Sequence, residues 1–216
     1  NDELIYTRGS NQGNEGIDIM VIHQLPRSQG GGYNYHGITQ KQCDAYYMKD
    51  GADCPGMNSM YQGREGYTDP SRYDVEARPS GVITQNELAE YPELGSMGTG
   101  VSKQYAAREP RFYASVGYNG SIWHMLNANT DKGEKTNVQI FYYRDKPDGY
   151  KAGAYWLHTG IGIKKFVNPH DRADSEKTYD VSRVQAKTAP DIRYAEVLLI
   201  YAEALNELEN VHEIPS

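Results

Sequence analysis

The sequence predicts an α+β fold that is mainly helical, with tetratricopeptide-like helices and a loop-rich region of short strands and hairpins. Two patterns lead to this prediction. Apolar side chains over 192–208 recur at the spacing of one helix face. Runs of β-forming residues bounded by turn residues occupy much of 111–167. The 216 residues are enough for one domain, so we expect a single domain over 1–216.

Composition narrows the choice of partners. The net charge is -7 and the Lys and Arg residues are scattered, which argues against a nucleic-acid partner. No apolar stretch approaches the roughly 20 residues that cross a bilayer, and the polar segment at Asn1 lacks the pattern of a signal peptide. We therefore expect a water-soluble chain, and any export signal or lipid anchor would lie outside this sequence.

The first fifty residues are predicted to form a loop followed by a short helix. Glycines are frequent over 9–37, which favours loop, with one candidate strand at 17–22. Residues 39–42 match the capping box, in which a Thr hydroxyl and a Gln side chain each satisfy a backbone N–H at a helix start. We expect a helix over about 39–48, ended by the Asp-Gly pair at 50–51.

Residues 50–100 show neither the helical nor the strand period for long. They are rich in Gly, Pro, Ser, Asp and Tyr. Long irregular stretches inside compact domains are usually functional or disordered, and the tyrosines favour a functional stretch. Beyond it, residues 103–109 are predicted to form a short helix that ends at Pro110.

Strands are predicted next. The run 111–116 is rich in β-forming residues, and the turn pair Asn119-Gly120 and then Ile122-Trp123 follow it, which indicates a hairpin or a strand corner. A second strand is expected over 138–143, and a third over 155–167, where apolar residues alternate.

The strongest local pattern runs from Ala189 to Leu208. Tyrosine and leucine side chains recur there with spacings of four and three, at Tyr194, Leu198, Tyr201, Leu205 and Leu208. A second row of alanines lets another helix come close. Such a helix is built to pack on helices, as in a tetratricopeptide hairpin, and the other predicted helices are too short to be its partner.

The two cysteines, Cys43 and Cys54, exclude a disulfide framework and a four-cysteine zinc site. They lie 11 residues apart around a predicted turn. A local disulfide and two separate thiols, one on a helix and one in a loop, both remain open.

Enzyme motifs are missing from the sequence. It contains no GxSxG, no HExxH and no phosphate-binding glycine loop. The six histidines lack metal-site spacing, and Glu65 and Asp69 lie in a Gly- and Pro-rich loop that suits a solvated turn or a cation ligand pair. We therefore expect no catalytic residue and no metal or other cofactor.

Four segments, in order along the chain, resemble the SusD/RagB family of Bacteroidetes outer-membrane lipoproteins. They are TQKQCDAYYMKDG at 39–51, REPRFY at 108–113 with Asn119-Gly120 and Trp123 after it, GIKKF at 162–166, and IRYAEVLLIYAEALNE at 192–207. Ile38, Glu109 and Lys164 replace the family's usual Pro, Asp and Arg, and these changes are conservative for structure.

The resemblance implies a non-enzymatic protein that binds extracellular oligosaccharide at the cell outer membrane and delivers it to a SusC-like TonB-dependent transporter. It also implies that 1–216 is a partial domain, without the family's N-terminal helical array and C-terminal end. Two alternatives are a tetratricopeptide-like scaffold without a small-molecule site and, more weakly, a secreted glycoside hydrolase.

Aromatic residues are the candidates for sugar binding, because sugar rings stack on Trp or Tyr while polar groups bind the hydroxyls. Trp123 is the first candidate platform because it follows a turn, although a Trp beside an Ile can equally be core. Tyr61, Tyr67 and Tyr73 in the long loop are the others. Trp156 lies within a strand pattern and is expected to pack.

Overall fold

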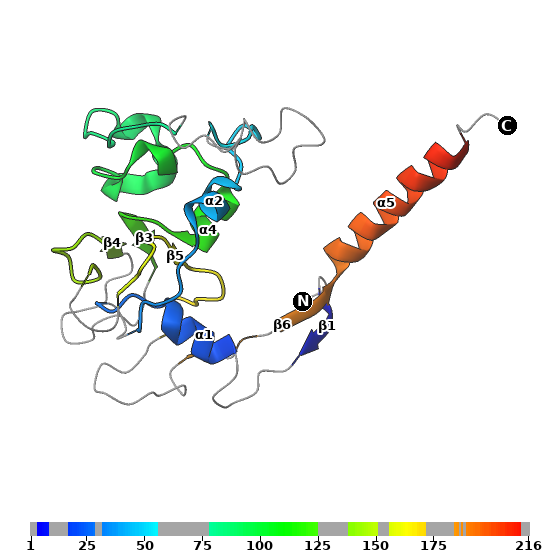
Figure 1. Cartoon of the computed structure of the whole chain (residues 1–216), viewed down its shortest axis with the longest axis horizontal. Coiled ribbons are helices and arrows are strands. Elements are labelled where there is room, and N and C mark those ends of the chain that lie inside the picture. Colours follow the sequence, from blue (N-terminus) through cyan, green and yellow to red (C-terminus); the bar gives the residue numbers. More distant parts are fainter. Residues whose placement is uncertain are drawn as a thin grey trace. The chain divides into compact units, whose positions relative to one another are not determined.

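The chain forms two compact units in the computed structural model (Figure 1). One unit comprises Asn1–Asp18 with Ala186–Ser216, and the other Ile19–Gln185. The structure describes residues 4–8, 17–28, 32–55, 78–124, 138–150, 156–171, 184–185, 187 and 189–212.

The smaller unit is a two-stranded sheet followed by one long helix. Strand β1 (Leu4–Arg8) pairs antiparallel with β6 (Ala189–Arg193), and α5 (Tyr194–His212) continues directly from β6 (Figure 1). The predicted helix is confirmed, but its start at Ala189 is wrong, because residues 189–193 pair with β1. A proline is tolerated at Pro190 because both strands of a two-stranded sheet are edges.

The apolar stripe of α5 is exposed. Its five members range from 44% exposed at Leu205 to 62% at Tyr201. The expected tetratricopeptide-like hairpin is not seen in the described residues, where α5 is the one long helix. The expectation of a mainly helical chain is also wrong for this part of the protein, in which short helices, strand pairs and loops are mixed.

The exposed stripe gives α5 an apolar surface that can self-associate. We expect the 216-residue chain to bind the dye ANS and to self-associate, since exposed apolar patches drive association. Leu198→Ser with Leu205→Ser should lower both signals, measured by dye fluorescence and sedimentation. Val82→Ser removes an exposed apolar side chain outside the helix and should change neither. A monomer that binds no dye would contradict this expectation.

The larger unit contains two more strand pairs. Strand β2 (Val116–Gly117) pairs with β5 (Gly162–Ile163), and β3 (Ser121–Trp123) pairs with β4 (Val138–Ile140). The Asn-Gly turn joins β2 to β3, with the Ser121 N–H donating to the Tyr118 carbonyl at 2.9 Å and Gly120 at φ 83°. Because β2 and β3 have different partners, the turn is a strand corner, which was one of the two predicted alternatives.

Helix α4 (Pro110–Ser115) occupies most of the predicted strand 111–116. Proline suits the first position of a helix, since its fixed φ is helical and its missing N–H would have no partner there. Pro110 therefore begins a helix instead of ending one. The residues before it contain a single 3-10 turn, η5 (Lys103–Tyr105), where a short helix was predicted.

Helix α1 (Ile17–Gln24) replaces the loop and candidate strand predicted at 17–22. Short apolar runs do not distinguish a strand from a helix. Val21, Ile22 and Leu25 are all buried, and this spacing places them on one helix face.

Helix α2 (Gln40–Asp44) has the predicted cap but is shorter than predicted. The Thr39 hydroxyl accepts a hydrogen bond from the Gln42 N–H at 3.2 Å. Nearby, Cys43 in α2 and Cys54 in a loop are buried thiols that form no disulfide with each other. Burial raises the pKa of Cys43 to about 12, so it holds its proton at neutral pH.

The remaining described elements are short. Two 3-10 helices, η3 (Leu88–Glu90) and η4 (Pro92–Met97), lie in the stretch predicted as irregular. The predicted strand 138–143 ends at Ile140 as β4, and the predicted strand 155–167 is reduced to β5.

Two clusters of buried side chains form the core of the larger unit. The first contains Val21, Ile22, Leu25, Trp123, Ile140, Tyr142, Leu157 and Val184. The second contains Cys43, Ile83, Leu94, Val101, Tyr105, Ala106, Phe112, Val116, Tyr118 and Ile161. Aromatic rings supply much of the volume in the second cluster, where the Tyr105 and Tyr118 rings stack with centroids 4.8 Å apart.

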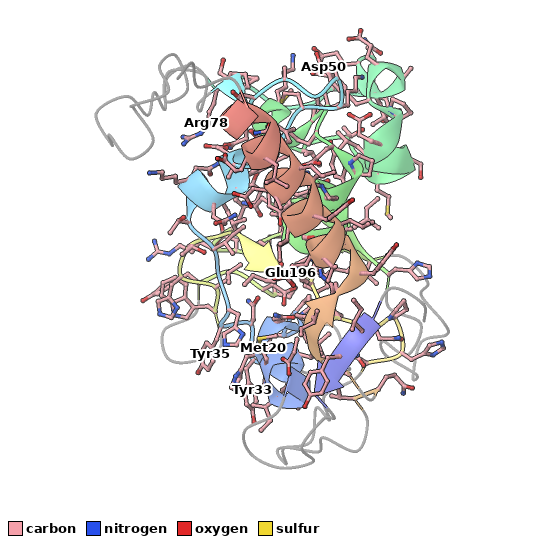
Figure 2. The ribbon with its side chains drawn as sticks, turned by 90° about the vertical axis from the view of Figure 1, so that its right-hand side faces the viewer. Met20, Tyr33, Tyr35, Asp50, Arg78 and Glu196 are labelled. Atoms are coloured by element: carbon pink, nitrogen blue, oxygen red, sulfur yellow. The ribbon has the colours of Figure 1, made fainter. Side chains whose placement is uncertain are left out.

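A buried arginine joins α2 to α4. Arg108, which is 2% exposed, donates to the carbonyls of Cys43 at 2.8 Å and Tyr46 at 2.6 Å. Asp44 is also buried and accepts from Arg78 Nε at 2.6 Å. Figure 2 labels Arg78 at the end of the unit opposite to α1. Because a helix leaves its last carbonyls without internal partners, Arg108 satisfies the end of α2.

Removing this arginine should destabilise the chain. We expect Arg108→Met to lower the free energy of unfolding by about 3–5 kcal/mol, because it removes a buried donor to the carbonyls of Cys43 and Tyr46 and a cation 4.0 Å from the buried Asp44 carboxylate. Arg111→Met is the matched control, since that side chain is 72% exposed and should matter little. Urea unfolding followed by circular dichroism measures both variants, and equal effects would contradict the assignment.

Candidate ligand-binding surface

Of the site residues predicted from the sequence, one lies in the core and three lie outside the described residues. Trp123 is 2% exposed and belongs to the first core cluster, which matches the core alternative. A Cβ at Gly117 would lie 2.8 Å from the Trp123 ring, so the indole packs directly on backbone. Tyr61, Tyr67 and Tyr73 lie outside the described residues.

A first group of rings lies beside α1. Its members are His23, Tyr33, Tyr35 and His36, which we call the His23 ring cluster. The His23 ring centroid is 5.3 Å from that of Tyr33, 6.0 Å from that of Tyr35 and 5.2 Å from that of His36. Tyr35 is 38% exposed and the other three are half-buried. Figure 2 shows Tyr33 and Tyr35 close together beside α1.

Backbone hydrogen bonds hold the His23 ring cluster in place. The N–H groups of Tyr35 and His36 donate to the His23 carbonyl at 2.8 and 3.2 Å, and the Tyr33 N–H donates to the Ile22 carbonyl at 2.9 Å. The segment thus folds back and satisfies carbonyls at the end of α1. Its rings are therefore supported by a helix end instead of extending from a free loop.

A second group of rings contains Tyr150, Trp156 and His158, the Trp156 ring cluster. Trp156 and His158 stack with centroids 4.1 Å apart, and Tyr150 meets the Trp156 ring edge-on at 4.9 Å. The Arg144 guanidinium lies 5.4 Å from the Tyr150 ring centroid. Tyr150 and His158 are exposed and Trp156 is half-buried. The prediction that Trp156 packs therefore holds only for part of its surface.

The segments that carry the two clusters contact each other. The Asn34 side chain donates to the Asp148 carbonyl at 3.0 Å, and the Ser28 N–H donates to the Asp148 carboxylate at 2.9 Å. An isolated β-bridge joins Gly37 to Gly162. Residues distant in sequence are thus tied into one region of the larger unit.

The two histidines of the His23 ring cluster favour the uncharged form. Burial lowers the pKa of both imidazoles, and the charge of His36 lowers that of His23 further. A neutral imidazole has one donor and one acceptor nitrogen. With tyrosine hydroxyls and ring faces beside it, this chemistry suits a ligand with both hydroxyl groups and apolar C–H faces.

These lowered pKa values predict a pH effect. In the unfolded chain the two imidazoles take up protons near pH 6.5, whereas in the folded chain they do so only at lower pH. The stability that the neutral histidines contribute is therefore fully present above pH 6.5 and is lost as the pH falls through the folded pKa values. His23→Gln with His36→Gln should flatten the fall in urea midpoint between about pH 7 and pH 5. His170→Gln, at an exposed site, is the control and should keep the wild-type slope. Equal slopes for all three proteins would contradict the effect.

The sequence contained one overlooked indication of these clusters. Aromatic side chains occur at spacing two in Tyr33 with Tyr35, Phe141 with Tyr143, and Trp156 with His158. In an extended backbone such residues lie on the same side, whereas the Tyr33–Tyr35 pair flanks Asn34, which is in the left-handed region at φ 54°. In each pair the two rings are in contact, at centroid distances of 6.2, 5.9 and 4.1 Å respectively.

The described residues contain few other functional features. No group of three or more His, Cys, Asp or Glu side chains gathers there to hold a metal ion. Within the same residues, no helix has the length and apolar character needed to cross a membrane. A pocket lined in part by Lys164 shares no lining residue with the two ring clusters.

The described residues form a mixed α/β framework that carries paired aromatic rings at its surface. The sequence profile of the SusD family matches residues 3–214, and the chain belongs to that family. A search of curated proteins finds no match.

Solved structures agree with this assignment. A SusD-like protein from Bacteroides fragilis NCTC 9343 is similar with a TM-score of 0.54 and 23% identity, over 98% of this chain and 34% of its own. The protein BT4246 is similar with a TM-score of 0.55 and 18% identity, over 97% of this chain and 30% of its own. Its selenomethionine form gives 0.51 and 18%, over 99% and 32%. The chain thus spans about a third of these structures and shares their fold.

Proposed function

We propose that this chain is part of a non-enzymatic cell-surface protein that binds extracellular oligosaccharide through the His23 and Trp156 ring clusters. The observation that carries the proposal is the pairing of rings at spacing two, each pair in contact and at least partly open to water. Ring faces supply apolar burial, and hydroxyl and imidazole groups supply hydrogen bonds. Tyr61, Tyr67 and Tyr73 are proposed as further contacts, and Trp123 as support from the core.

Family membership supports the wider setting of the proposal. We infer an outer-membrane lipoprotein that passes its glycan to a SusC-like TonB-dependent transporter and needs no cofactor. Residues 1–216 are proposed as one part of the family's domain. In the whole protein, the exposed stripe of α5 would pack against other helices, as in tetratricopeptide repeats.

A scaffold without a small-molecule site is the second candidate, and the exposed α5 stripe favours it. The two functions make different demands on the protein. Glycan capture needs the ring clusters, whereas a scaffold needs α5 and should tolerate loss of the rings.

Affinity electrophoresis in gels that contain neutral polysaccharides tests the first function. Tyr35→Ala and Trp156→Ala should each weaken binding by about 10- to 100-fold, since a stacking ring contributes roughly 1–3 kcal/mol. Tyr47→Ala removes a 46% exposed tyrosine outside the clusters and should bind as the wild type does. Trp123→Ala should instead lower stability by about 3–5 kcal/mol through a core cavity.

Three outcomes would count against the proposal. Equal retardation of the Tyr35, Trp156 and Tyr47 variants would remove the ring clusters from the site. No retardation of the wild type by any glycan would favour the scaffold. Release of reducing ends from the gel polysaccharide would point to a hydrolase.

A further inference from the structure

A small pocket in the larger unit contains one cationic group. It has a volume of about 210 Å³ and lies where α4, β3 and the residues after β5 meet. Its lining residues are Tyr113, Ala114, Ile122, Trp123, His124, Lys164, Val167 and Pro169. Pockets for drug-sized ligands measure roughly 300–1,000 Å³, so this one suits a single compact unit and not an extended chain.

Lys164 is the charged anchor of the pocket. Its ammonium donates to the Ile122 carbonyl at 3.2 Å and lies 5.9 Å from the Trp123 ring centroid. An ammonium has three N–H donors, so this geometry leaves donors for a ligand. None of the lining residues is acidic, and no ion pair of Lys164 is found in the described part of the chain.

The polar side chains of Tyr113 and Trp123 in the lining do not balance this charge. The Tyr113 hydroxyl is already engaged, since it donates to the Tyr105 carbonyl at 2.9 Å and accepts from the Arg108 N–H at 3.1 Å. The indole of Trp123 can only donate. Next along the chain, the Lys165 ammonium adds positive charge from an exposed position, 5.8 Å from the Phe166 ring.

A poorly solvated cation without a counter-ion lowers the stability of a fold. Burial lowers the pKa of Lys164 to about 8, which shows that its charged form is disfavoured by the surroundings. An anion that entered the pocket would reverse this effect, because opposite charges in a poorly solvated site attract strongly.

We propose that this pocket binds one carboxylate-bearing sugar unit, a hexuronate, whose carboxylate pairs with the Lys164 ammonium. The C–H face of the sugar would lie against the apolar side chains of Ile122, Val167 and Pro169. The pocket is a second site, and it can hold a uronate whether or not the ring clusters bind neutral glycan.

Isothermal titration calorimetry on the full chain tests the proposal, with glucuronate as the probe and glucose as its neutral counterpart. Wild-type protein should bind glucuronate, and Lys164→Met should weaken that binding about tenfold or more, as for loss of one partner of a buried charge pair. Lys165→Met is the matched control, because it removes a neighbouring exposed lysine, and it should bind as the wild type does.

The urea midpoint shows whether a variant that fails to bind has lost the binding site or has unfolded. Lys164→Met replaces a disfavoured cation by an apolar side chain of similar length, so its urea midpoint should equal or exceed that of the wild type. Equal glucuronate binding by the Lys164 and Lys165 variants would overturn the proposal. So would equal affinity for glucose, or tighter binding of inorganic sulfate or acetate than of glucuronate, because the pocket would then not be a uronate site.

Discussion

The fold of the larger unit depends on a buried cation, the guanidinium of Arg108. It donates to the carbonyls of Cys43 and Tyr46 at the end of α2, and Arg108 itself lies two residues before the start of α4 at Pro110. A helix cannot satisfy all of its last carbonyls, and the Arg108 guanidinium adds a buried donor at the end of α2. Within the motif at 108–113, Arg108 therefore has a structural role.

Tyrosine has two opposite roles in this unit. Tyr105 and Tyr118 stack in the core, and burial raises the pKa of both hydroxyls. Tyr35 and Tyr150 instead lie at the surface in the ring clusters. Composition alone cannot distinguish these roles, because the same ring provides core volume and a binding face. The difference arises from the backbone. It turns one set of tyrosines inward, and hydrogen bonds hold the segments of the other set at the end of α1 and to Asp148.

Some short-range patterns were predicted correctly, others were not, and long-range contacts were not predicted at all. The Thr39 cap, the strand corner at Asn119-Gly120 and helix α5 each follow from signals within a few residues. The strand predicted at 111–116 is wrong because local β propensity was given more weight than the start signal of Pro110. The ring clusters were missed because the local spacing-two pattern was overlooked, and their proximity could not be predicted because the contact between Asn34 and Asp148 joins residues 114 positions apart. For Trp123, the residue type allowed both a core and a platform position, and only packing could decide.

The two binding sites that we propose differ in charge, so salt should affect binding at each of them differently. Burial lowers the pKa of both imidazoles of the His23 ring cluster and favours their uncharged form, so its proposed attraction for a hydroxylated ring should depend little on salt. The chain as a whole carries a net charge of -7, which repels an approaching acidic glycan over distances up to the Debye length of about 8–10 Å. The pairing with Lys164 acts only after that approach and is screened less, because the ammonium is partly buried. Added salt therefore acts in two directions on an acidic ligand: it relieves the repulsion during approach, and it weakens the final pair by a smaller amount.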